Sequence, residues 1–164
     1  MTAAPMGTIA EETRRRVPMT GKADFTAEEW DTVLEGPTSA GLIVSTAQRG
    51  GSFREALAMA KAYAEARKEH GESELLDEIV SHKPEVDHTR AHSPEELKEH
   101  GLQRIRDAVA LLAQKATPQE LDDYRSFVAS LAERVAGAKT EADDQPVSDA
   151  ERAAIAEIAQ VLGS

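Results

Sequence analysis

The sequence predicts a single all-α domain, a bundle of about six helices preceded by a flexible N-terminal tail. Three observations support this fold class: few aromatic residues beside abundant alanine, a repeated helix-start motif, and apolar residues at helical spacing. Aromatic residues make up 4% of the 164-residue chain. Alanine is the best helix former, whereas sheets favour aromatic and β-branched side chains. A chain of this length buries a substantial core as one domain.

The helix-start motif is the capping box, Ser/Thr-x-x-Glu, in which the hydroxyl and the glutamate each satisfy a backbone N–H group at the helix N-terminus. Two of the boxes have a proline at the first helical position, where proline is favoured. Repetition of the motif at typical helix lengths predicts a helix start at each box. The pairs are Thr26/Glu29, Ser52/Glu55, Ser93/Glu96, Thr117/Glu120 and Ser148/Glu151.

Apolar periodicity gives the extent of each helix, as in the series Leu121, Tyr124, Val128 and Leu131. No segment shows a convincing strand pattern. Gly36-Pro37 should kink or break the first helix, because proline lacks a backbone donor and clashes with the preceding turn. The predicted helices lie near residues 27–48, 53–70, 74–82, 94–115, 118–138 and 149–162.

The predicted domain limits are a disordered tail at residues 1–24 and a helical domain at residues 25–164. The tail is rich in proline, threonine, glycine and charge and has no periodicity. A second irregular segment, residues 82–93, exceeds the roughly 2–8 residues usual between packed helices. Connections of this length are functional or mobile, so this segment is a candidate site.

The chain carries a formal net charge of −11, which opposes binding to nucleic acid and to anionic membranes. The basic run Arg14–Arg16 is expected to be solvated. No segment approaches the roughly 18 apolar residues of a membrane span or shows the apolar core of a signal peptide. We therefore expect a soluble cytoplasmic protein whose partner is another protein.

The sequence offers little for catalysis. It has no cysteine, which excludes disulfides, thiolate metal sites and thiol nucleophiles, and it lacks the known nucleophile, phosphate-loop and dinucleotide motifs. Gly50-Gly51-Ser52 fits a loop closed by a helix cap. Acidic pairs such as Asp77/Glu78 and Asp122/Asp123 are expected on solvated helix faces. The prediction is a non-enzymatic interaction or regulatory module.

A divalent metal is the one cofactor for which the sequence offers ligands. The loop before the last helix supplies carboxylates suited to Ca²⁺ or Mg²⁺: Asp143, Asp144, Asp149 and Glu151. An EF-hand loop starting at Asp143 is excluded, since its twelfth position is Ala154. Acidic residues at a helix N-terminus also have an alternative explanation, the favourable interaction with the helix dipole.

The alternative metal site is a zinc site in the segment that contains most of the histidines. Imidazole nitrogens and one carboxylate could bind Zn²⁺ there: His82, His88, His92 and Asp87. His82, near Pro84, also fits the end of a helix, where a cation complements the terminal carbonyls. Two loop histidines alone bind metal weakly, so a solvated loop is the competing interpretation.

The stretch ADDQPVSDAERAAIAEIAQVLG, residues 142–163, resembles the closing segment of TerB-like proteins, the tellurite-resistance-associated superfamily. The shared pattern is an acidic loop, then Ser-x-x-Glu, then a short helix that ends in Leu-Gly. KADFTAEEWDTVL, residues 22–34, echoes this pattern. The loop departs from the usual Asp-Gly of the family, having Asp144-Gln145-Pro146.

The resemblance implies an all-helical bundle with acidic loops that bind metal and a stress-related or scaffolding role. The positions that it implicates in metal binding are Asp143, Asp144 and Glu151, with Asp24 and Glu29 as a weaker counterpart.

Overall fold

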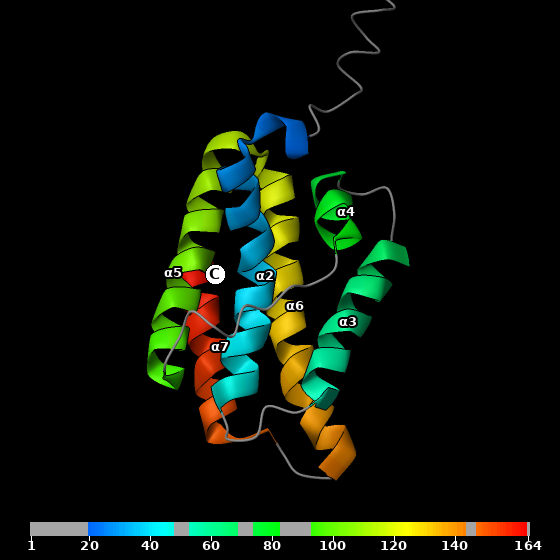
Figure 1. Ribbon diagram of the computed structural model, residues 1–164, viewed down its shortest axis with the longest axis vertical. Coiled ribbons are helices and arrows are strands. Elements are labelled where there is room, and N and C mark those ends of the chain that lie inside the picture. The colour runs from blue at the N-terminus through cyan, green and yellow to red at the C-terminus, as the bar shows by residue number, and fades with distance from the viewer. Residues whose placement is uncertain (1–19, 48–52, 69–73, 83–92, 144–146, 164) are drawn as a thin grey trace, which may run out of the picture.

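The computed structural model describes residues 20–47, 53–68, 74–82, 93–143 and 147–163 (Figure 1). These residues form one short 3-10 helix and six α-helices, and none of them forms a strand, which confirms the predicted all-α class. The elements are η1 (Lys22–Asp24), α2 (Ala27–Ala47), α3 (Phe53–Lys68), α4 (Glu74–Ser81), α5 (Pro94–Lys115), α6 (Pro118–Asp143) and α7 (Asp149–Leu162).

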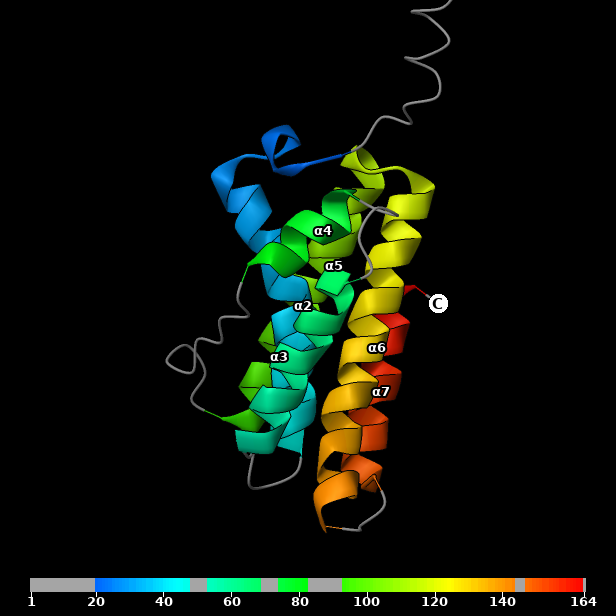
Figure 2. The same ribbon diagram turned by 90° about the vertical axis from the view of Figure 1, so that its right-hand side faces the viewer.

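Helix α2 is the central element of the bundle. It packs most extensively on α5 and also contacts α6, α7 and α3, while α3 and α4 lie against α6 on the side away from α5 (Figures 1 and 2). Every residue from Gly36 to Gly41 is buried. These residues are mostly small, so neighbouring helices can approach the backbone of α2 closely.

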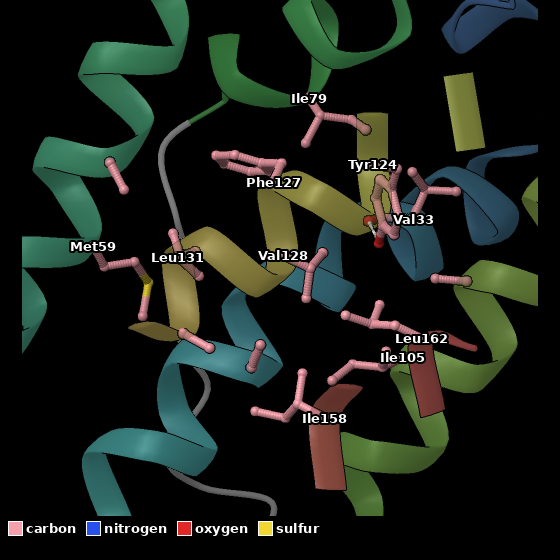
Figure 3. Packing of buried hydrophobic residues seen from close by; sticks show 14 of the residues in the cluster. Val33, Met59, Ile79, Ile105, Tyr124, Phe127, Val128, Leu131, Ile158 and Leu162 are labelled. Carbon is pink, nitrogen blue, oxygen red and sulfur yellow. Dashed lines mark hydrogen bonds between the residues drawn. The ribbon is translucent and has the colours of Figure 1, made fainter. Parts of the chain in front are cut away.

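One apolar cluster joins all six α-helices (Figure 3). Its centre is formed by side chains that are almost fully buried, because their helices present apolar residues at three- and four-residue spacing toward one another. Each such side chain contributes about 1.5–3 kcal/mol when it is fully removed from water. The members labelled in Figure 3 include Val33, Ile105, Val128, Leu131, Ile158 and Leu162.

Helix α2 continues through Pro37, so of the kink or break predicted at Gly36-Pro37 the break does not occur. Proline has no N–H group to donate to the carbonyl of Val33, four residues earlier. The buried hydroxyl of Tyr124 on α6 donates to that carbonyl instead, at an oxygen–oxygen distance of 2.8 Å (Figure 3). A tertiary hydrogen bond thus replaces the one that the helix lacks.

The predicted capping boxes account for most of the helix starts. The reciprocal hydrogen bonds are present at Thr26/Glu29, Thr117/Glu120 and Ser148/Glu151, and the Ser93 hydroxyl accepts from the Glu96 N–H group. The remaining pair, Ser52/Glu55, lies outside the residues and side chains that the structure describes.

Helix α6 is longer than predicted, because it passes Gly137 and ends at Asp143 instead of near residue 138. A glycine inside a helix costs only about 1 kcal/mol relative to alanine. That is too little to stop a helix whose preceding turns are packed against the core.

The predicted limit between tail and domain at residue 24 is too late. Thr20 is buried, and its N–H and hydroxyl groups donate to the two carboxylate oxygens of Glu120, at 3.0 and 2.8 Å. The Lys22 N–H group donates to Glu78 on α4. Residues 20–24 therefore belong to the bundle and connect α4 with α6; residues 1–19 lie outside the described residues.

Replacing Glu120 with alanine should lower the free energy of unfolding by about 2 kcal/mol, because the Thr117 cap and the buried Thr20 N–H group lose their acceptor together. The matched control is Glu133→Ala, at an exposed position on the same helix. This control should change the free energy of unfolding by no more than about 0.5 kcal/mol. Urea denaturation of the original protein and the two variants measures both changes. Equal effects would contradict the role assigned to Glu120.

Candidate functional site

The structure places Glu151 in the cap of α7. Its side chain is 2% exposed, and Oε1 accepts hydrogen bonds from the Ser148 N–H and hydroxyl groups, at 3.3 and 2.8 Å. Its Oε2 is buried and has no hydrogen-bond partner among the described atoms. Asp149 is exposed in the first turn of the same helix. The Asp143 side chain and all of Asp144 lie outside the described residues.

Of the predicted zinc ligands, the structure describes only His82. It is exposed just after α4, and its ring meets the edge of Trp30 with the centroids 6.3 Å apart. Asp87, His88 and His92 lie outside the described residues. Among the side chains that are described, no three His, Asp or Glu groups converge in an arrangement that could hold a metal ion.

The weaker metal counterpart, Asp24 and Glu29, is engaged in local structure. Asp24 accepts from the Gly21 N–H group at 2.9 Å, and Glu29 accepts from the Thr26 N–H group and from the Lys115 ammonium, each at 2.9 Å. The pKa of Glu29 is lowered, most strongly by the hydrogen bond from the Thr26 backbone N–H group and next by the one from the Lys115 ammonium. Both carboxylates therefore serve helix starts at this end of the bundle.

A pocket of about 270 Å³ opens where α3, α4 and α6 meet; we call it the acidic groove. The apolar side chains that line it are buried or half-buried, and we call them its floor; the polar and charged ones are half-buried or exposed, and we call them its mouth. The volume is slightly below the range of roughly 300–1,000 Å³ typical of small-molecule sites. The floor is formed by Ala62, Ala66, Leu76, Phe127 and Leu131, and the mouth by Glu65, Asp77, Asp123, Ser126, Ser130 and Arg134.

Among the described residues that line the acidic groove there are three carboxylates and one guanidinium, whose formal charges sum to −2. The one guanidinium, of Arg134, forms an ion pair with Glu65 across α3 and α6. Asp123 on α6 accepts from the Gln119 amide at 3.0 Å, and α4 contributes Asp77 to the same lining. The groove therefore favours a ligand that combines positive charge with an apolar surface.

Sequence reasoning assigned Asp77 and Asp123 to solvated helix faces and did not single out Glu65. Asp77 and Asp123 are half-buried, Glu65 is exposed, and three separate helices bring them to one groove. No spacing within the sequence signals that convergence.

Comparison with known protein families, curated proteins and solved structures finds no match for this chain. The resemblance to TerB-like proteins therefore remains a prediction. None of the described helices is both long and apolar enough to span a membrane.

Proposed function

We propose that this protein is a non-enzymatic interaction or regulatory module that contacts its partner protein through the acidic groove. The observation that supports this proposal is the groove itself, a pocket lined by buried and half-buried apolar side chains together with three carboxylates. An apolar hollow surrounded by polar groups is typical of a recognition surface. The two buried carboxylates of the described residues, Glu120 and Glu151, serve helix caps, whereas the carboxylates of the groove are half-buried or exposed.

Metal binding remains the alternative proposal. The buried, unpartnered Oε2 of Glu151 supports it, but the neighbouring candidates Asp143 and Asp144 lie outside the described side chains. We therefore base the proposed function on the groove.

Site-specific photo-crosslinking tests the interaction proposal. A photoreactive amino acid at Ser126, in the mouth of the groove, should form a discrete adduct with a partner protein in cells. The same amino acid at Gln103, an exposed position on α5, should not. The partner identified from the adduct is then purified and its affinity for the protein measured.

A matched pair of charge reversals gives the decisive comparison. Asp123 in the groove and Asp107 on α5 each accept from a glutamine amide four residues earlier, at 3.0 and 2.9 Å. Asp123→Lys should weaken binding of the purified partner at least about tenfold, which corresponds to roughly 1.4 kcal/mol, whereas Asp107→Lys should leave it unchanged. Adducts of equal yield at both positions, or equal effects of both reversals, would refute the groove as the binding site.

A further inference from the structure

We propose that the acidic groove is an arginine-recognition site and that its occupant is the run Arg14–Arg16 of the same chain. The inference rests on the proposed function, since it concerns the same groove. It adds the chemistry of the ligand and the means by which the groove is regulated.

The composition of the groove matches a guanidinium better than an ammonium group. Guanidinium is planar and weakly hydrated, so its face can lie on the apolar lining to which Phe127 contributes while its N–H groups bond to carboxylates. An ammonium group is compact and strongly hydrated, and it loses more on entering an apolar pocket. The ion pair of Arg134 with Glu65 shows that a guanidinium is already held at this mouth.

The described start of the chain is anchored beside the helices of the groove. Thr20 is held by Glu120 on α6, and the Lys22 N–H group by Glu78 on α4. Residues 20–22 thus connect two of the three helices that form the groove. In Figure 2 the blue start of the described chain lies beside the start of α6, at the same end of the bundle as α4.

The number of residues between Thr20 and the arginines suits the distance to be covered. Arg16 and Arg14 lie four and six residues before Thr20, so extended chain carries them up to about 14 and 21 Å from it. Along α6, Asp123 lies about 5 Å and Arg134 about 21 Å beyond Glu120, at a rise of about 1.5 Å per residue. The near end of the groove, at Asp123, is therefore within the covalent reach of all three arginines.

Charge and connectivity both favour this occupant. Arg14–Arg16 is the only run of three consecutive basic residues in a chain of net charge −11. A short tether gives an effective concentration on the order of millimolar, so an intrinsic affinity that is weak still fills the groove. A partner must then displace the chain's own arginines, which sets a threshold for binding.

NMR of the isotopically labelled full chain tests the inference. Replacing the run by alanine, as Arg14→Ala/Arg15→Ala/Arg16→Ala, should shift the amide signals of Asp123, Ser126 and Ser130. Arg106→Ala, an exposed position on α5, is the control and should leave those signals in place. The peptide TRRRVP, the sequence of residues 13–18, added to the triple variant should return the signals toward their original positions. The peptide TKKKVP should bind at least about tenfold more weakly.

Each contrary result has a distinct meaning. If TRRRVP binds the groove but the triple substitution moves no groove signal, self-occupancy is refuted while arginine recognition and the proposed function stand. If the shifts depend on protein concentration, a second copy supplies the arginines and the intramolecular proposal fails. If neither peptide binds, arginine recognition is refuted, and the proposed function is decided by photo-crosslinking alone.

Discussion

Replacing Gly36 with alanine should destabilise the protein by about 3 kcal/mol or more, because the new methyl group overpacks the core and displaces a buried hydrogen-bond donor. A Cβ atom at this position would lie 1.9 Å from the Tyr124 hydroxyl oxygen and 3.1 Å from the ring carbon that bears it. Tyr124 is 1% exposed, so its ring cannot move aside freely. If the hydroxyl shifts, the Val33 carbonyl loses its donor, and Pro37 has no N–H group to replace it.

A double-mutant cycle with Tyr124→Phe isolates this cause. Alone, Tyr124→Phe should cost about 1–3 kcal/mol, the penalty for leaving the buried Val33 carbonyl unsatisfied. In the phenylalanine background the oxygen at 1.9 Å is absent and the ring carbon at 3.1 Å remains. The added cost of Gly36→Ala should therefore be clearly smaller than in the original protein.

Urea denaturation of the four proteins measures the coupling, and Gly137→Ala is the matched control. Gly137 is inside helix α6, and an added Cβ there would meet nothing within 4 Å. That substitution should stabilise the protein by up to about 1 kcal/mol through helix propensity. Additive effects of Gly36→Ala and Tyr124→Phe would contradict the steric explanation.

The same residues show what local sequence reasoning could and could not predict. Capping boxes and apolar spacing depend on contacts within one or two helical turns, so the starts and buried faces of the helices were predictable. The continuity of α2 was not, because it depends on Tyr124, which lies 91 residues from Val33 in the sequence. In α2 the hydroxyl of Tyr124 supplies the donor that Pro37 lacks, so the local rule that proline breaks a helix fails there.

The candidate site was less predictable than the fold for a related reason. Helical periodicity places Glu65, Asp77 and Asp123 on polar faces, but it does not say which polar faces meet. Their convergence depends on the packing order of α3, α4 and α6, which no local pattern encodes. The predicted metal residues, by contrast, were chosen for their proximity in sequence. In the structure, Glu151 and its sequence neighbour Ser148 form a helix cap.

Above about pH 10, the ordinary pKa of tyrosine, the free energy of unfolding should fall steeply with pH. Burial raises the pKa of Tyr63, against the opposing charge of Arg67, and burial also raises the pKa of Tyr124, reinforced by the charge of Tyr63. Below pH 10 both states retain the two phenol protons. Above it, the unfolded chain releases them and the native protein does not, so the unfolded state binds fewer protons and stability decreases.

The expected slope for two such groups is about −2.7 kcal/mol per pH unit, since each contributes about 1.36. Tyr63→Phe removes one ionisable group and leaves the hydrogen bond from Tyr124 to Val33 intact, so it should make the slope less steep by about 1.36 kcal/mol per pH unit. Urea denaturation at intervals between pH 9 and 12, with both proteins in the same buffers, measures this difference. Other groups that titrate in this range are common to the two proteins and cancel in the comparison. Equal slopes would mean that Tyr63 ionises as readily in the folded protein as in the unfolded chain, and that its burial does not control alkaline unfolding.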